Sequence, residues 1–409
     1  MTEQLKLKLN DSKATRWGAL VIVAFTMMAA YYVNDVVAPL KTMLETDLAW
    51  SSTDFGFFTG GYSFLNVFFL MLIWGGLILD RFGIRFTGKL ATILMVGGTA
   101  LEYYAMTGLA GADATLFGIN EIFGYKTGVF VAFAGYSIFG VGAEVAGITV
   151  SKIIAKWFKG KELATAMGVQ VALARIGSQA GYAVAIPLAR AFGISTPVLL
   201  GLVLLLGGMI AFFIFAVMDK KLDKQMEAAA IAAGTEDEEE KFSFKDVKNI
   251  LVNPGFWLIA LLCVLFYSCV FPFQKFASEL MIIKYGINEN VAGTFAGLPA
   301  LGALILTPVF GGFIDKRGKS ASIMLLGSAM LICVHFIYAI PDINYWLVAI
   351  VLMIILGIAF SLVPSAMWPA VAKIFPVSQL GTAYALIFFI QNIGLWGIPT
   401  LIGWVLDAY

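Results

Sequence analysis

Long apolar stretches separated by short polar segments dominate this chain. A helix needs about 20 apolar residues to cross the roughly 30 Å hydrocarbon core of a bilayer, and eleven stretches are long enough. The expected spans are residues 17–40, 54–79, 87–107, 128–154, 163–192, 197–218, 255–283, 291–314, 320–340, 345–372 and 381–406. The pattern therefore predicts an all-α polytopic membrane protein.

One polar segment, residues 219–254, separates six expected spans from five. Its charge runs are typical of a solvated cytoplasmic linker with some helix. The expected organisation is a six-helix bundle over residues 1–218, this linker, and a five-span bundle over residues 255–409. A protein with two equal halves would have a twelfth span after Tyr409, and we expect it to be missing here.

Composition excludes several classes of protein. The chain is 60% hydrophobic and 13% charged, which is too apolar for a soluble globule of 409 residues. The net charge of +1 gives no basic surface, so no nucleic-acid partner is expected. The single histidine, His335, excludes a histidine-based metal cluster, and the three cysteines all lie in apolar stretches. No HExxH motif, Walker loop or nucleophile–histidine arrangement occurs, so we expect no enzyme, no metal and no cofactor.

The positive charges indicate the orientation in the membrane. Most of the 27 lysines and arginines lie in the N-terminal segment, in alternate loops and in the polar linker. The positive-inside rule then places the N-terminus in the cytoplasm. The first apolar stretch is too long for a signal peptide, so we expect it to be retained. The expected partners are the bilayer and a small-molecule substrate, bound by a monomer.

A short string recurs in both halves of the chain. The loop after the second span reads GGLILDRFGIR and the loop after the eighth reads GGFIDKRGK. In each, a glycine, three residues, an aspartate, a basic residue, one residue and a glycine follow one another. The positions are Gly76, Asp80, Arg81 and Gly83, with Arg85 just beyond, and Gly311, Asp315, Lys316 and Gly318. Glycine allows a tight turn, and the aspartate can pair with a basic group or a helix N-terminus. Repeated halves are typical of transporters in which one half rocks against the other around a central site.

This repeated string resembles the signature loop of the major facilitator superfamily, and the resemblance covers essentially the whole chain. It implies twelve spans in two pseudo-symmetric six-helix bundles, an inverted-repeat fold and transport by alternating access. The chain departs from this pattern by ending after the eleventh expected span.

Two opposite charges lie near the middle of the bilayer. Arg175 is roughly 18 Å along its helix at 1.5 Å per residue, and Glu144 is roughly 15 Å from the same side on the preceding span. Gln179 and Tyr182 share the helical face of Arg175, so this face is predicted to line a cavity. A charge at this depth needs a partner or water. Either the two charges form a structural ion pair, or Arg175 binds a substrate carboxylate while Glu144 receives an amine or a proton. A zwitterionic solute would use both.

Further candidates lie in other spans. Asp35, roughly 27 Å along the first span, is a candidate amine-binding or outer-gate residue. Lys275 either serves the site or pairs with Glu279 one turn away. The second half offers Trp368, Gln391 and Asn392, for which packing and polar contacts between helices are the competing explanations. Prolines beside Trp368 predict a bent helix.

Longer strings resemble one branch of the superfamily, the lysosomal dipeptide transporters and their prokaryotic relatives. They are IFGVGAE, KWFKGKELATAMGVQVALARIGS, FPF, and MWPAVAKIFPVSQLGTAYALIFFIQNIGL. The resemblance implies that Glu144 and Arg175 take part in dipeptide binding. It favours a secondary transporter of dipeptides or similar zwitterions.

Two features bear on location and on coupling. The N-terminus has no acidic dileucine sorting signal, so a multi-pass protein of a bacterial-type plasma membrane without an accessory subunit is expected. Proton-coupled peptide symporters have an ExxER cluster in the first span, whereas this chain has only Asp35 there. This difference favours a uniporter. Protonation of Asp35 or Glu144 would still allow transport to be coupled to protons. The alternative functions are a proton-coupled organic-anion carrier and, less favoured, a receptor that binds without transport.

Overall fold

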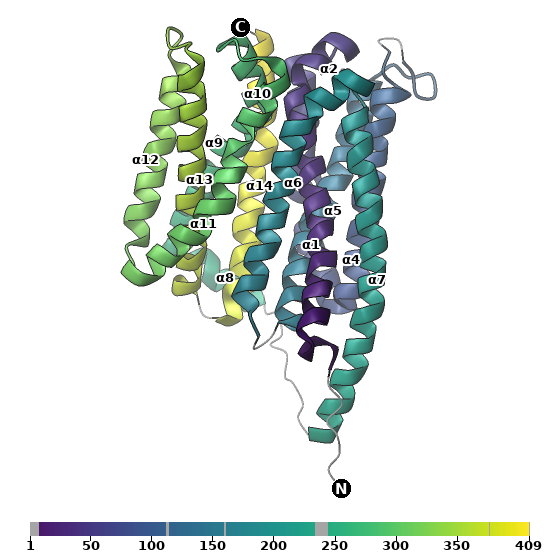
Figure 1. Cartoon of the computed structure of the whole chain (residues 1–409), viewed down its shortest axis with the longest axis vertical. Coiled ribbons are helices and arrows are strands. Elements are labelled where there is room, and N and C mark those ends of the chain that lie inside the picture. Colours follow the sequence, from purple (N-terminus) through teal and green to yellow (C-terminus); the bar gives the residue numbers. More distant parts are fainter. Residues whose placement is uncertain (1–7, 112–113, 159–160, 234–243, 376, 409) are drawn as a thin grey trace.

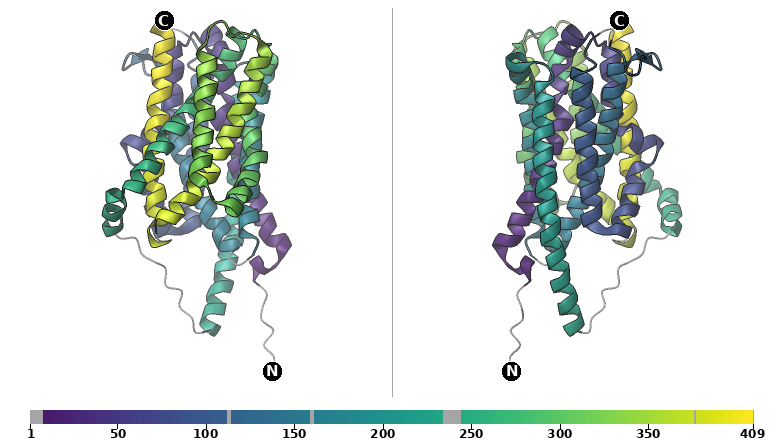
Figure 2. Two further views of the ribbon diagram at one scale, coloured as in Figure 1. Left: turned by 90° about the vertical axis from the view of Figure 1, so that its left-hand side faces the viewer. Right: turned by 90° about the vertical axis from the view of Figure 1, so that its right-hand side faces the viewer.

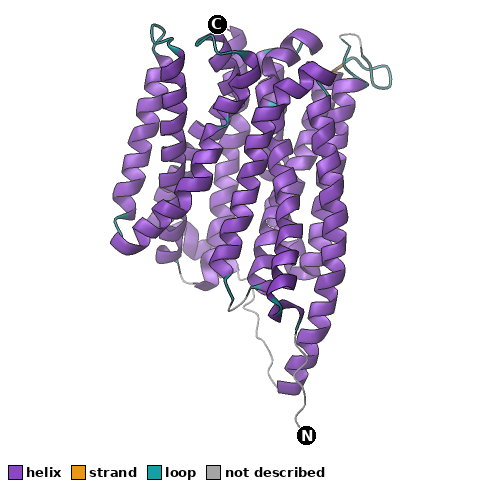
Figure 3. Ribbon diagram, viewed as in Figure 1, coloured by secondary structure: helices purple, strands orange, loops and turns teal. Residues whose placement is uncertain are grey.

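The computed structural model describes residues 8–111, 114–158, 161–233, 244–375 and 377–408. Helices make up almost all of it (Figure 3), and a two-residue antiparallel pair, β1 (Glu121–Ile122) with β2 (Tyr125–Lys126), closes one loop. The helices run side by side, and the N- and C-termini lie at opposite ends of the bundle (Figure 1). We call the end with the N-terminus the inner end and the other the outer end.

The first half of the chain contributes the helices at one side of the bundle. They are α1 (Lys13–Val36), α2 (Lys41–Leu48), α3 (Ser52–Phe68), α4 (Met71–Thr107), α5 (Thr127–Trp157), α6 (Leu163–Phe192) and α7 (Thr196–Ala233), with short 3₁₀ helices η1 (Leu9–Asp11) and η2 (Ala38–Leu40). The second half contributes α8 (Phe244–Val252), α9 (Pro254–Ile283), α10 (Glu289–Ala296), α11 (Leu298–Arg317), α12 (Ser320–Ala339), α13 (Trp346–Ile374) and α14 (Val377–Ala408). In Figure 1, α12 and α7 lie at opposite edges, and α6 and α14 lie between them.

Within the described residues, eight helices are long and apolar enough to cross a membrane, or nine if the bent pair α3 and α4 counts as one span. This is fewer than the eleven expected spans, for two reasons. Helix α4 joins two segments at Gly83, whose φ of 74° and ψ of 174° are not helical, so the second and third expected spans meet there. Helix α6 has the length but carries Gln170, Arg175 and Gln179, which lower its hydropathy.

The break between α3 and α4 was not predicted. The helices meet at an angle of 58° around Phe69 and Leu70, and Leu70 has a left-handed φ of 53°. Helix α13, where prolines predicted a bend, is assigned as one helix from Trp346 to Ile374.

The expected boundary at residue 218 falls inside a helix. Helix α7 continues to Ala233 and extends beyond the bundle at the inner end (Figure 2). Asp219, the first residue of the segment that was interpreted as a solvated linker with some helix, has a side chain that is 0% exposed. It accepts hydrogen bonds from Lys156 at 2.7 Å and from the Trp157 indole at 2.9 Å. Residues 234–243 of the expected linker lie outside the described part.

Candidate transport cavity

A cavity of about 1180 Å³ lies between the two halves. Helices α1, α3, α4, α5 and α6 line it from the first half, and α8, α9, α13 and α14 from the second. It extends from Asp35 and Lys275 toward the outer end to Asp80 and Val247 toward the inner end. Its volume exceeds the roughly 300–1,000 Å³ of common small-molecule pockets, so a solute of dipeptide size fits with water.

Arg175 lines the middle of this cavity, as predicted. Its guanidinium carbon lies 5.5 Å from the ring centre of Tyr31 on α1 and 5.0 Å from that of Phe360 on α13. The structure records no hydrogen bond or ion pair to it from the described residues. The aromatic rings therefore orient the guanidinium, while its N–H donors stay available to a ligand.

Glu144 on α5 also lines the cavity. The hydroxyl of Tyr62 on α3 donates a hydrogen bond to its carboxylate at 3.0 Å. No ion pair within 4.0 Å joins Glu144 to Arg175, although both residues are described. In this conformation the structural ion pair is therefore absent, and two opposite charges face one cavity without neutralising each other directly.

The second half supplies an aromatic wall to the cavity, made of Tyr267, Phe271, Trp368, Tyr384 and Phe388. The Trp368 indole donates to the Tyr267 hydroxyl at 3.2 Å and stacks on Phe388 at 4.8 Å between ring centres. These contacts pack the indole into the cavity wall, so Trp368 combines the two explanations weighed for it, cavity lining and packing.

The two adjacent amides of α14 have different surroundings. Gln391 lines the cavity, and its oxygen lies 3.4 Å from the Cys263 sulfur. Asn392 is buried, is not among the cavity-lining residues, and donates to the Phe388 carbonyl at 2.9 Å. Consecutive residues point in directions about 100° apart on a helix, and here Gln391 faces the cavity whereas Asn392 faces the packed interior.

Asp35 and Lys275 meet across the two halves near the outer end. The Lys275 ammonium donates to Asp35 at 3.2 Å, to the Tyr136 hydroxyl at 3.3 Å and to the Asn34 carbonyl. The alternative of a Lys275–Glu279 pair within α9 is wrong. Glu279 instead binds Lys41 of the first half at 2.5 Å.

The contacts that join the two halves at this end, beginning with the Asp35–Lys275 and Lys41–Glu279 pairs, are called the outer seal below. Lys41 is 1% exposed and also binds Glu45 at 2.5 Å and Ser52 at 2.8 Å. The seal further includes the Arg190–Glu289 ion pair and the Asp407 carboxylate, which accepts from the backbone N–H of Ser52 at 3.0 Å.

Gln179 and Tyr182 belong to the outer seal and are not among the cavity-lining residues. Gln179 donates to the Thr294 carbonyl at 3.3 Å, and Tyr182 donates to the Gln274 carbonyl at 3.2 Å. The prediction that they line the cavity with Arg175 is wrong in this conformation. They share its helical face, but one to two turns further out that face meets the second half instead of open space.

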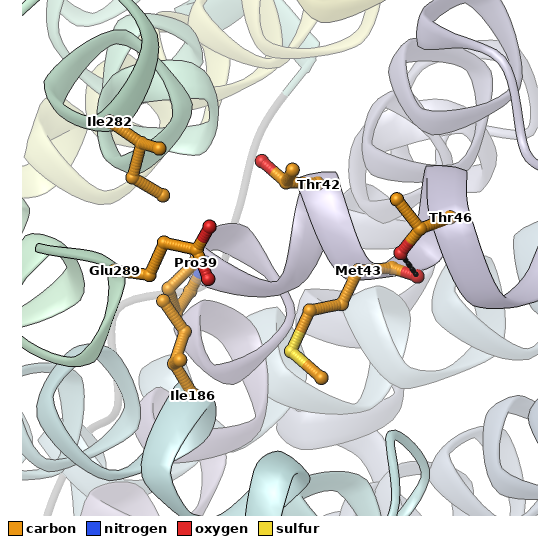
Figure 4. A pocket seen from close by; sticks show the side chains of 7 residues that line it. All are labelled: Pro39, Thr42, Met43, Thr46, Ile186, Ile282 and Glu289. Carbon is orange, nitrogen blue, oxygen red and sulfur yellow. Dashed lines mark hydrogen bonds between the residues drawn. The ribbon is translucent and has the colours of Figure 1, made fainter. Parts of the chain in front are cut away.

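A small cavity of about 100 Å³ lies inside the seal (Figure 4). Thr42, Met43 and Thr46 of α2 approach it from one side and Glu289 of α10 from the other. This cavity is too small for a dipeptide, and the Glu289 carboxylate beside it already pairs with Arg190.

The repeated turns lie at the inner end. Asp80 pairs with Lys152 of α5 at 2.9 Å, and Arg85 pairs with Asp223 of α7 at 2.5 Å. Gly83 and Gly318 both have positive φ, of 74° and 69°, which explains the glycines at the two matching positions. Gly76 and Gly311 have open space where a Cβ would lie. Arg81 lies over the Phe82 ring and Lys316 is exposed, whereas the side chain of Asp315 lies outside the described ones.

Sequence reasoning missed several groups. Tyr31, Tyr62 and Tyr136 contact the charges of the cavity, and aromatic residues in apolar helices give no signal of this. Lys41 and Glu102 were detectable, because both are charged residues in or beside an expected span. In the part of the chain that the structure describes, no group of three or more potential metal ligands gathers. Both His335 nitrogens lie about 3 Å from backbone carbonyls, at 3.0 and 3.1 Å, in line with a satisfied histidine.

Long apolar helices in two halves, with a charged cavity between them, form the architecture that is typical of a secondary transporter. Comparison with known proteins agrees. The profile of the Major Facilitator Superfamily matches residues 20–397, so the chain belongs to this family, whose members are transporters and not enzymes. The lysosomal dipeptide transporter MFSD1 of Homo sapiens is 29% identical over 97% of this chain and 81% of its own length.

Solved structures agree on the fold. A bacterial homologue of the human lysosomal transporter Spinster, in an inward-facing and unoccupied conformation, superposes with a TM-score of 0.66 and 16% identity over 97% of this chain and 84% of its own. A D-xylose–proton symporter superposes with a TM-score of 0.64 and 16% identity over 95% of this chain and 89% of its own.

Proposed function

We propose that this protein transports dipeptides, or similar small zwitterions, by facilitated uniport. The observation that carries the proposal is that Glu144 and Arg175, both described, face one cavity with no ion pair between them. A cavity lined by two opposite charges with no ion pair between them suits a ligand that brings both complementary charges. The similarity to dipeptide transporters of other organisms supports the same choice.

Each end of the substrate has a suitable partner. The guanidinium of Arg175 can bind a carboxylate through two parallel hydrogen bonds. The Glu144 carboxylate receives the α-ammonium, with Tyr62 holding its orientation. The aromatic wall around Trp368 and Phe388 then faces the side chains, and Gln391 offers its amide to the peptide group.

Transport follows from alternating access between the two halves. We infer eleven crossings, with residues 1–218 and 255–409 as the moving halves and the N-terminus in the cytoplasm. The cavity lining reaches Asp80 at the inner end, whereas the outer seal closes the other end, so this conformation corresponds to release or uptake at the inner side. The turns at Gly76–Arg85 and Gly311–Gly318 fix the ends of the moving helices. We expect a monomer in a bacterial-type plasma membrane.

The test is ligand-induced thermal stabilisation of the purified protein. A ligand at about 100 times its Kd should add roughly 2.7 kcal/mol. The panel contains dipeptides, single amino acids and dicarboxylates, with Arg175→Ala and Glu144→Gln as variants. Dipeptide shifts abolished by both substitutions support the proposal. Shifts with dicarboxylates alone, lost in Arg175→Ala but kept in Glu144→Gln, would point to an organic-anion carrier instead.

Binding alone does not establish transport. Counterflow of a labelled dipeptide in proteoliposomes separates a transporter from a receptor, because a receptor gives the stabilisation without flux. A dipeptide level that an imposed proton gradient does not raise above equilibrium supports uniport.

A further inference from the structure

Glu102 is a buried acid that the transport cavity does not use. It lies on α4, its side chain is 0% exposed, and neither carboxylate oxygen has a hydrogen-bond partner among the described residues. The helix packs tightly there, since a Cβ at Gly98 would lie 2.5 Å from the Gly135 carbonyl oxygen of α5. A bare carboxylate in such a place costs several kcal/mol, so this group needs an explanation.

The groups around Glu102 belong to the outer seal. Glu102 lies beside Gly135 of α5, where a Cβ would come within 2.9 Å of the Glu102 backbone nitrogen, and the next residue, Tyr136, accepts a hydrogen bond from Lys275 of α9 at 3.3 Å. Lys275, which also binds Asp35 of α1, is a charged group that acts on Glu102. Helix α7, which also packs on α4, has no ionisable side chain between Thr196 and Met218. The cluster therefore holds two carboxyl groups and one ammonium.

The charges of this cluster do not balance when both acids are ionised. Lys275 donates to Asp35 at 3.2 Å, and the Asn34 amide donates to Asp35 at 2.8 Å. Asp35 is thus stabilised as an anion, whereas Glu102 has no donor in the described structure. A proton on Glu102 removes the excess negative charge from the carboxyl group that has no hydrogen-bond donor to stabilise it.

We propose that Glu102 is a proton-binding site that controls the outer seal. The closed seal holds Glu102 neutral behind Tyr136. When the halves part at the outer end, water reaches the cluster and Glu102 releases its proton. Lys275 leaves with α9, but burial acts on Glu102 more strongly than this ammonium does, so hydration decides the outcome. This inference rests on the alternating halves of the proposed function but not on the identity of the substrate.

The sign of the pH response distinguishes the two acids. If Glu102 ionises in the open state, closing takes up a proton, and the ratio of closed to open protein falls up to about tenfold for each unit of rising pH. If Asp35 titrated instead, protonation would break its pair with Lys275, so acid would open the seal. The two groups therefore give opposite directions.

The experiment measures the distance across the outer end with no substrate present. Spin labels are attached at Asp47→Cys on α2 and Asn344→Cys before α13, both exposed, in a chain whose Cys263, Cys269 and Cys333 are replaced by serine. Distances are recorded in lipid nanodiscs from roughly pH 5 to pH 9, a range that spans the titration of shifted carboxyl groups. We expect the short distance to lose population as the pH rises, Glu102→Gln to stay closed throughout, and the control Glu121→Gln, on the exposed β1, to follow the parent protein.

Three results would overturn the proposal: no pH response in the parent protein, a response of opposite sign, or a response that survives in Glu102→Gln. If Glu102→Gln does not fold, Glu102→Ala takes its place in the same measurement, and a pH response that survives in that variant would equally overturn the proposal. Since the labels report conformation alone, failure of dipeptide binding leaves this test intact.

Discussion

The outer and inner ends of this bundle use charged residues in different ways. At the outer end most described ion pairs cross between the halves, as in Lys41–Glu279 and Asp35–Lys275, whereas Lys41–Glu45 stays within α2. At the inner end the described ion pairs stay within the first half, as in Asp80–Lys152 and Lys156–Asp219. Breaking an outer pair should therefore change the equilibrium between conformations, whereas breaking an inner pair should change the stability of one half.

The largest effect is expected for Lys41→Met. The substitution leaves Glu45 and Glu279 facing each other at the seal without their shared cation. Removing one partner of a buried ion pair costs about 3 kcal/mol or more, which is roughly two factors of ten in the closed-to-open ratio. The spin-label distance across the outer end measures this shift.

Lys284→Met is the matched control for this variant. Lys284 lies near the same end but donates at 2.6 Å to the carbonyls of Tyr338 and Ile340 within the second half. It should lower the melting temperature without opening the seal. Equal opening in both variants would contradict the distinction between contacts that cross the halves and contacts that do not.

Asp219→Asn tests the inner end. The carboxylate is buried and accepts from Lys156, Trp157 and Arg85, so loss of its charge should destabilise the first half by about 2 kcal/mol. The outer distance should not change. Thermal unfolding together with the outer distance checks both statements, and a large change in that distance would show that the two ends are coupled.

The extent of the helices could be predicted from the sequence because the length of a membrane-crossing helix is read from the residues of that helix alone. The expected spans 163–192 and 255–283 match α6 and α9 almost residue for residue. The break at Phe69 and Leu70 could not be predicted, because neither proline nor glycine occurs there and the bend depends on what α3 and α4 each pack against. The extension of α7 likewise depends on partners that Asp219 finds on α4 and α5.

The charged residues of the candidate cavity could be predicted from the sequence, but the surfaces and partners that surround them could not. Depth in the bilayer was enough to select Glu144 and Arg175 for the cavity, because a charge there needs water or a partner. Depth did not show which surface each turn of α6 meets, so Gln179 and Tyr182 were assigned to the cavity and lie in the seal. The partners of Lys275 and Lys41 come from the opposite half, and no spacing within one helix reveals them.

Glycine packing on the second expected span offers a smaller test of the same contrast. At the outer end a Cβ on Gly56 would lie 2.4 Å from the Pro399 carbonyl oxygen of α14, whereas near the inner end a Cβ on Gly76 would meet nothing within 4 Å. Gly56→Ala should therefore force the halves apart at a cost of between about 1 and 2 kcal/mol. Gly76→Ala should be neutral or stabilise by up to about 1 kcal/mol, because alanine favours the helix. Thermal unfolding of the two variants, with the outer distance for Gly56→Ala, tests the pair, and equal losses of stability would refute it.

The smallest effect is expected at Glu162, which joins α1 to α6 at the inner end. Hydrogen bonds from the Trp17 indole, then from Arg16 and Lys13, lower the pKa of Glu162 to about 2. A lowered pKa in the folded protein stabilises it above the ordinary value of 4.5, and this contribution is lost as the pH falls toward 2. The melting temperature should therefore fall more steeply over that interval in the parent protein than in Glu162→Gln, and high salt should reduce the difference because the side chain is partly exposed. Because the contact lies within the first half, the outer distance should be the same in both proteins; a shift in that distance would mean that inner-end contacts of one half also hold the outer seal.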